Sequence, residues 1–114
     1  MARNISFMMT TEQVKARTKT VTRRIGWKNL RKYTVLNACE KCMGLKKGET
    51  VNILCQIKVI SVGRERLSDI IHRVTDLQKE GFPQLTPWGF VEMFCREMEC
   101  TPETEVTRIE FEYL

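Results

Sequence analysis

The feature that most constrains the fold is a long alternation of apolar and polar side chains between Val51 and Val62. Apolar residues occupy positions 51, 53, 55, 57 and 59, polar residues occupy positions 52, 56 and 58, and Leu54 interrupts the alternation. A period of two is typical of a β-strand with one buried face. Strands in open sheets usually have about five or six residues. A strand of twelve residues therefore favours a sheet that curls into a barrel.

Shorter elements are predicted on both sides of this strand. We expect strands at residues 5–9, 33–39 and 104–114, and short helices that begin at Thr10, Thr75 and Thr86. Threonine is a good N-cap, and Pro87 suits the first helical position after Thr86. The third helix has an apolar face at helical spacing, predicted to pack in the core: Phe90, Val91, Phe94, Cys95 and Met98.

The predicted fold class is α+β and mainly β. Because closure of a sheet removes its exposed edges, we expect a small mixed β-barrel with short peripheral helices. The sequence contains no linker or internal repeat, so residues 1–114 are predicted to form a single domain. A composition of 42% apolar and 29% charged residues is ordinary for such a domain.

The sequence predicts a cytoplasmic protein with no membrane partner. No apolar run approaches the roughly 18 residues that span a bilayer. The apolar piece near the N-terminus is too short for a signal peptide. We also expect a monomer.

Five cysteines, an odd number, predict reduced thiols and not a disulfide framework. The pair Cys39-x-x-Cys42 allows a zinc site or a redox site. Structural zinc needs four ligands, and only Cys95 and Cys100 would complete the set. A redox pair is expected between a strand and a helix, whereas a loop is predicted over residues 41–49. The prediction is therefore buried or incidental thiols, with no metal and no cofactor.

Charge is distributed unevenly along the chain. Residues 1–48 hold 12 basic and 2 acidic residues, a net charge of +10, whereas residues 49–114 hold 7 and 12, a net charge of −5. A basic half favours a surface that faces a polyanion. The alternative is that basic and acidic side chains mix in space and leave no such surface.

The basic half contains a segment from Lys19 to Trp27 that combines cations, hydroxyls and an aromatic ring. A regular strand has two faces, which would be Thr20, Thr22 and Arg24 on one side and Lys19, Val21 and Arg23 on the other. Lys19 and Thr22 therefore meet only if the backbone is irregular at Lys19. A lysine becomes a base or nucleophile only where burial or a second cation lowers its pKa.

The pattern Lys19-x-x-Thr22-x-Arg24 resembles the signature of the ASCH domain family, a branch of the PUA-like barrels. The layout along the rest of the chain is similar: Lys46-Lys47-Gly48-Glu49 before the long strand, Glu80-Gly81-Phe82 in the middle, and Phe111-Glu112-Tyr113-Leu114 at the end. Many small phage and prophage members look like this chain. One departure is Arg17, because the family often has glycine two positions before the lysine.

The resemblance implies a β-barrel surrounded by short helices, with a cleft that accepts RNA or a modified nucleoside. Some small bacterial members of the family are amidohydrolases for N-acetylated cytidine, and others have been assigned ribonuclease activity. Carried over by motif, the catalytic residues would be Lys19, Thr22 and Glu80. Lys19 would then deprotonate Thr22 or a water, and Glu80 would order the lysine or pass a proton to the leaving amine.

Binding without catalysis is the function that the sequence favours. The candidate contacts to RNA or a nucleoside are Arg17, Thr20, Arg23, Arg24, Trp27 and Lys28, because cations contact phosphates and tryptophan stacks on bases. In the plainest alternative, Lys19 and Arg24 only contact phosphate, Thr22 pairs within the sheet and Glu80 forms a salt bridge. A phage-encoded module that binds a host protein is a further alternative, and the acidic second half would suit it.

Overall fold

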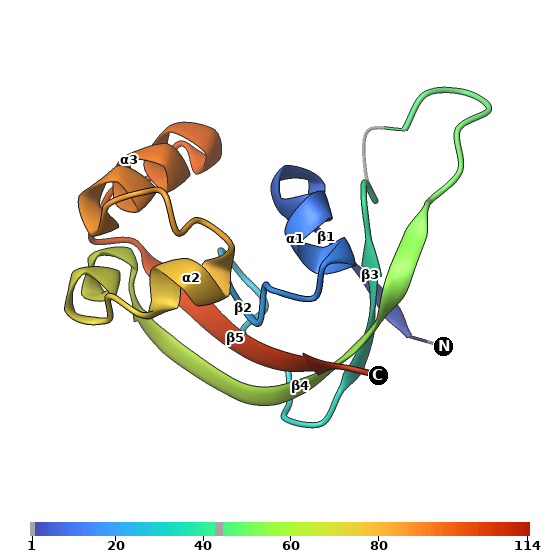
Figure 1. Ribbon diagram of the computed structural model, residues 1–114, viewed down its shortest axis with the longest axis horizontal. Helices are drawn as coiled ribbons and strands as arrows, with labels where there is room; N and C mark the ends of the chain where they lie inside the picture. Colours follow the sequence, from blue (N-terminus) through green and yellow to red (C-terminus); the bar gives the residue numbers. More distant parts are fainter. Residues whose placement is uncertain (1, 43–44) are drawn as a thin grey trace.

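One curled, mixed β-sheet forms the centre of the molecule (Figure 1). The computed structural model describes residues 2–42 and 45–114. Within these residues, the five strands are β1 (Arg3–Ser6), β2 (Val21–Arg24), β3 (Val35–Cys39), β4 (Ile53–Arg66) and β5 (Glu105–Tyr113). Their order across the sheet is β1-β3-β4-β5-β2. Strand β1 runs parallel to β3, and the other neighbouring strands are antiparallel.

The predicted long strand is confirmed as β4, which has 14 residues. Its first part pairs with β3 and its second part pairs with β5, so this one strand joins both sides of the sheet. The register with β5 shifts between Val59 and Ser61, and such a bulge increases the local bend and twist. The strand therefore curls, and its alternation places Ile57 and Val59 in the core.

The sheet curls into a half-barrel and does not close, which corrects the prediction of a closed barrel. In the part of the chain that the structure describes, no ladder pairs the two edge strands, β1 and β2. Each edge strand has four residues, and short edge strands are one way in which open sheets limit exposed pairing groups. A side chain bridges the gap instead, because Arg24 Nη2 donates to the carbonyl oxygen of Ser6.

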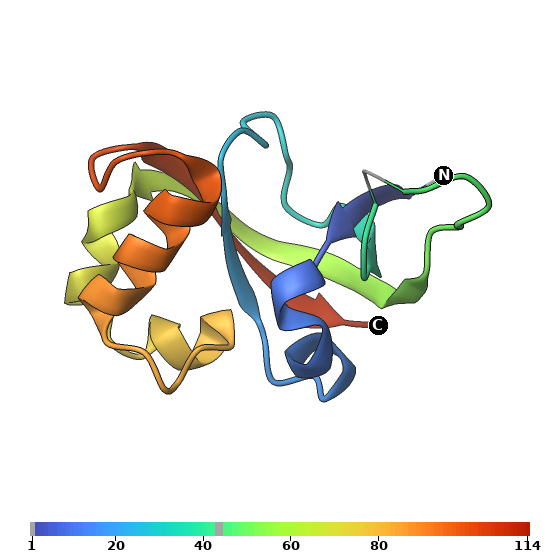
Figure 2. The ribbon, with the colours of Figure 1, turned by 90° about the horizontal axis from the view of Figure 1, so that it is seen from above.

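The helices gather on one side of the sheet (Figures 1 and 2). Residues 2–42 and 45–114 contain two 3-10 turns, η1 (Met8–Thr10) and η2 (Leu67–His72), and three α-helices, α1 (Thr11–Lys15), α2 (Asp76–Glu80) and α3 (Pro87–Met98). The predicted cap of α3 is confirmed, since Thr86 Oγ1 accepts from the Gly89 amide at 3.0 Å. Helices also begin after Thr10 and Thr75, although neither side chain makes a capping hydrogen bond. Among the described helices, none is long and apolar enough to cross a membrane.

Two apolar clusters form the core, and β5 contributes to both. Ile109 and Phe111 belong to the cluster inside the curled sheet, and Val106 belongs to the cluster under α3. The second cluster buries three residues of the predicted apolar face of α3: Phe90, Val91 and Phe94. Burial of each such side chain favours folding by about 1.5–3 kcal/mol. Met98 of the same face is half exposed.

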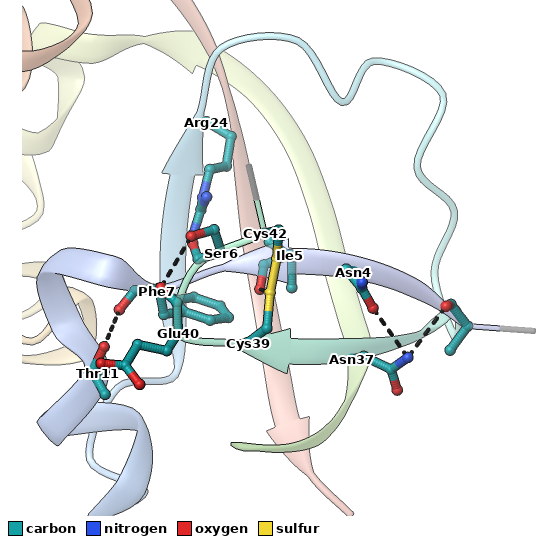
Figure 3. The surroundings of a disulfide bond; sticks show 11 residues. Asn4, Ile5, Ser6, Phe7, Thr11, Arg24, Asn37, Cys39, Glu40 and Cys42 are labelled. Atoms are coloured by element: carbon teal, nitrogen blue, oxygen red, sulfur yellow. Dashed lines mark hydrogen bonds between the residues drawn. A yellow bond between two sulfur atoms is a disulfide. The ribbon is translucent and has the colours of Figure 1, made fainter. Parts of the chain in front are cut away.

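Cys39 and Cys42 form a disulfide (Figure 3), so the prediction of reduced thiols is wrong for this pair. Their Cα atoms lie 6.4 Å apart at the end of β3, a separation that a disulfide can bridge. A count of cysteines cannot reveal that proximity. Cys55, Cys95 and Cys100 are free thiols. Of the predicted loop over residues 41–49, residues 43 and 44 lie outside the described residues.

Candidate functional site

A pocket of about 360 Å³ lies where the β2 edge of the half-barrel faces helix α3. Phe7 from the first apolar cluster and Phe90 from the second both line it. Its polar lining includes Lys19, Thr22, Arg23, Arg24 and Glu80. The three predicted catalytic residues thus face one cavity, although they come from β2, from the segment before it and from α2.

Lys19 reaches this pocket because the chain before β2 is irregular. Helix α1 has already ended, and Arg17 takes a left-handed φ of 61°, which favours glycine over residues with a Cβ. This is the position at which the ASCH family often has glycine. Strand β2 begins only at Val21. The backbone condition for Lys19 and Thr22 to share a site is therefore met.

Glu80 is placed by the way helix α2 ends. Gly81 follows it with a φ of 95°, and a Cβ at position 81 would lie 3.1 Å from Gln13 Cγ. Both the conformation and the space therefore favour glycine there. Lys19 Nζ donates to the Glu80 carbonyl oxygen at 2.5 Å and to Glu80 Oε1 at 3.1 Å. One residue thus holds the lysine through two oxygens.

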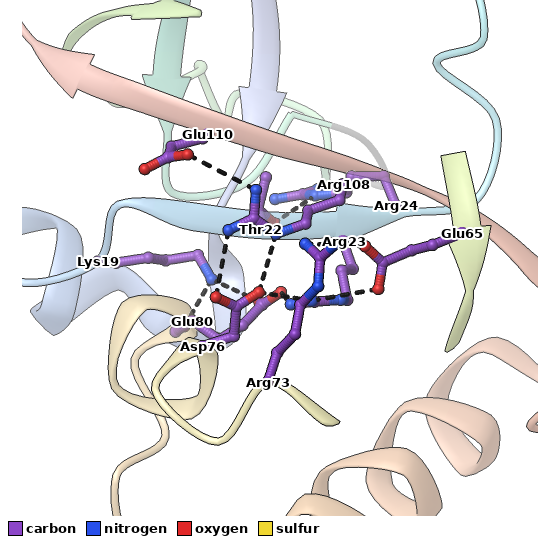
Figure 4. Close-up of polar contacts among 10 residues, drawn as sticks. All are labelled: Lys19, Thr22, Arg23, Arg24, Glu65, Arg73, Asp76, Glu80, Arg108 and Glu110. Atoms are coloured by element: carbon purple, nitrogen blue, oxygen red, sulfur yellow. Dashed lines mark hydrogen bonds and ion pairs between the residues drawn. The ribbon is translucent and has the colours of Figure 1, made fainter. Parts of the chain in front are cut away.

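Arg23 connects Glu80 to two further carboxylates (Figure 4). Its guanidinium donates to Glu80 Oε2 at 2.9 Å, to Asp76 Oδ2 at 2.6 Å and to Glu65 Oε2 at 3.3 Å. Arg108 on β5 donates to both oxygens of Asp76, at 2.8 and 3.1 Å. Cations and carboxylates therefore alternate through a buried network, which offsets the cost of removing each charge from water. The network fixes the Glu80 carboxylate beside Lys19.

The contacts of Arg24 within the described residues are with neutral groups. Its Nε donates to Thr22 Oγ1 at 3.0 Å, and its guanidinium lies 4.9 Å from the ring centroid of Phe7. Because Thr22 Oγ1 accepts this hydrogen bond, its own proton is free for another acceptor. No hydrogen bond in the described structure joins Thr22 to Lys19 Nζ. Proton transfer between these two groups therefore needs a bridging group.

The pKa of Lys19 is lower than that of an ordinary lysine. Burial is the main cause; Glu80 opposes it, and Arg24 and Arg23 lower the pKa further. Burial also lowers the pKa of Arg24 to about 10. Only the unprotonated amine can accept a proton, and a lowered pKa increases the share of that form at a given pH. Lys19 is therefore suited to act as a base.

Comparison with known proteins gives no match: no family model, no curated protein and no solved structure matches this chain. The resemblance to the ASCH family and the PUA-like assignment therefore stay predictions. The architecture itself is a curled mixed half-barrel with a few short helices.

The other predicted binding residues lie outside the pocket. Arg17 is exposed, and the backbone oxygen of Thr20 accepts a hydrogen bond from the Phe111 amide of β5. The ring of Trp27 is covered by the guanidinium of Arg3, which lies 3.8 Å from the ring centroid. Lys28 lines a separate, more open depression. The fold thus separates residues that are close together in the sequence.

Three members of the network are not predicted from the sequence: Glu65, Asp76 and Arg108. A signal for Asp76 does exist, because it lies four residues before Glu80 and residues four apart share one face of a helix. Two carboxylates on one face of a short helix indicate a cationic partner. Glu65 and Arg108 lie on strands and carry no comparable signal.

The network makes stability depend on pH through Asp76. Burial by itself would raise the pKa of Asp76, but hydrogen bonds from Arg108 and Arg23 outweigh it and lower the pKa from 3.8 to about 2. A carboxyl with a lower pKa in the folded state stabilises the protein at higher pH and loses that contribution as the pH falls. We expect the free energy of unfolding to fall by roughly 1–2 kcal/mol as the pH drops from about 4 to about 2 and Asp76 becomes protonated.

Urea unfolding across this pH range measures the effect. The matched control is Asp76→Asn, which keeps the size of the side chain and cannot titrate. The variant should be less stable at pH 7 and should lose less stability on acidification. Equal acid-dependent losses in both proteins would contradict the assignment to Asp76.

Proposed function

We propose that this protein binds a nucleoside whose base carries an acylated amino group. The pocket carries this proposal. Its volume of about 360 Å³ falls at the lower end of the range for small-molecule sites, about 300–1,000 Å³. Cations, carboxylates and aromatic rings line the pocket together, which suits a planar base with polar edges. The resemblance to the ASCH family implies the same class of ligand.

The rim of the pocket favours a small ligand over an RNA chain. A phosphate backbone is held mainly by cations that reach into solvent. Lys19 and Arg23 are buried, whereas the rim residues Met8, Met98 and Glu97 are apolar or acidic. The pocket therefore suits an uncharged nucleoside better than a polyanion.

Hydrolysis of the acyl group is a second candidate, favoured by the lowered pKa of Lys19. Neutral Lys19 would take a proton from a water, and the water oxygen would attack the acyl carbon. The carbon–nitrogen bond then breaks, and the proton passes to the leaving amine through Lys19 or Glu80. The products are a carboxylic acid and the free nucleoside. If Thr22 attacks instead, the acyl group is first transferred to its oxygen, and a water releases it in a second step.

Calorimetric titration with cytidine, and with cytidine acetylated on its exocyclic amine, tests the binding. We expect the acetylated nucleoside to bind more tightly, with an affinity that changes little with salt because the ligand is uncharged. A single-stranded RNA oligonucleotide is the comparison. If only the RNA binds, with a steep loss of affinity at high salt, the nucleoside proposal is wrong. Chromatography of the mixture for released cytidine distinguishes hydrolysis from binding alone.

A further inference from the structure

Part of the pocket lining is apolar and partly open to solvent. Its methionines come from η1 and α3: Met8, Met9, Met93 and Met98. The side chains of Met8, Met9 and Met98 are 62%, 50% and 49% exposed. Single exposed apolar residues are common, but a group of them at the mouth of a cavity marks a binding surface. We call this surface the methionine wall.

Methionine suits a surface that contacts apolar groups of varying shape. Its side chain is unbranched, flexible and polarizable, so it repacks around a ligand. Its sulfur is only a weak hydrogen-bond acceptor. Ribose hydroxyls placed against it would lose their bonds to water without replacement. The polar edges of a bound nucleoside therefore belong near Lys19, Arg24 and Glu80.

We propose that the methionine wall binds the acyl group of the ligand, and that the protein prefers acyl groups longer than acetyl. This rests on the proposed function, because it requires that an acylated nucleoside enters the pocket. An amide beside Lys19 has two ends, the nucleobase and the acyl chain. The base and ribose carry hydrogen-bonding groups, whereas an alkyl chain carries none. The chain is the end that gains from leaving water at the wall.

The length of the acyl chain should therefore set the affinity. Each buried methylene strengthens binding about fourfold. Butanoyl has two more methylenes than acetyl, so we expect butanoyl cytidine to bind roughly fifteenfold more tightly. Titration with cytidines acylated by acetyl, propanoyl and butanoyl groups measures this, with kcat/KM as the readout where turnover occurs. A succinyl group matches butanoyl in carbon number and should lose the gain, because its carboxylate would leave water beside Glu97.

Met9→Ser and Met98→Ser test the wall without disturbing the core, since both side chains are about half exposed. The ratio of butanoyl to acetyl affinity should fall toward one in these variants. Trp88→Ser is the matched control. Trp88 lies on the same helix and is 51% exposed, but it does not line the pocket. This control should keep the wild-type ratio.

The possible failures are distinguishable. If acetyl cytidine binds but longer chains bind equally or more weakly, the wall is not the acyl site and the proposed function survives. A ratio that the methionine variants leave unchanged also overturns the inference. If none of the acylated cytidines binds, the proposed function fails and the inference fails with it.

Discussion

Lys19→Met is expected to slow the hydrolysis of an acylated cytidine by about 10²–10⁴-fold while the protein stays folded. Methionine approximates the length of the lysine side chain but cannot accept the proton. Glu80 keeps a cationic partner in the variant, because Arg23 donates to its second carboxylate oxygen at 2.9 Å. The fold should therefore tolerate the change. Chromatographic assay of released cytidine gives the rate, and thermal unfolding reports on the fold.

Lys15→Met is the matched control for this experiment. Lys15 is an exposed lysine on α1 that pairs with Glu12 at the surface, so its loss should leave the rate unchanged. Undiminished turnover in Lys19→Met would remove Lys19 from the mechanism. A Lys19→Met protein that fails to fold would assign the lysine a structural role.

Arg23→Met is expected to lower the free energy of unfolding by about 3–5 kcal/mol. The Arg23 side chain is fully buried and contacts Glu65, Asp76 and Glu80. Its loss removes a cation that contacts all three carboxylates. A loss of this size is a large fraction of the roughly 5–15 kcal/mol that separates the folded and unfolded states of a typical domain. Urea unfolding at neutral pH measures it.

Glu105→Gln is the control for burial. Arg64 and Glu105 form an ion pair with the same 2.6 Å separation as Arg23 and Asp76, but their side chains are 29% and 65% exposed. Exposed pairs contribute about 0–1 kcal/mol. Similar losses of stability in Arg23→Met and Glu105→Gln would contradict the claim that the buried network contributes more to the free energy of unfolding than an exposed ion pair.

The strands with one buried face could be predicted from the sequence. The alternation identifies Ile57 and Val59 of β4 and Ile109 and Phe111 of β5 as core residues, because successive residues of a strand point to opposite faces. It does not extend to Ile53 at the start of β4, which is half exposed. The start of α3 was also predictable, since the cap at Thr86 depends only on residues three positions apart. Whether the sheet closes could not be predicted, because closure depends on how far the short edge strands β1 and β2 extend toward each other.

The site was predictable only through its motif. Lys19, Thr22 and Glu80 do line one pocket. The spacing of residues along the sequence could not reveal that Trp27 and Lys28 lie outside it. Charged residues are expected at the surface by default, so nothing in the sequence marks Arg23 as buried. The pairing of Cys39 with Cys42 likewise depends on the local path of the chain and not on the number of cysteines.

The bridge from Arg24 to the Ser6 carbonyl oxygen has a consequence for ligand entry. The same guanidinium holds Thr22 through Nε and joins the two free edges of the sheet through Nη2. A ligand oxygen that accepts a hydrogen bond from Nη2 must compete with the Ser6 carbonyl oxygen. Ligand binding in the pocket and the Arg24–Ser6 contact between β2 and β1 are therefore thermodynamically linked. That linkage is reciprocal. A change that weakens the Arg24–Ser6 contact makes Arg24 more available to a ligand, and a ligand that binds Arg24 weakens the contact between β1 and β2.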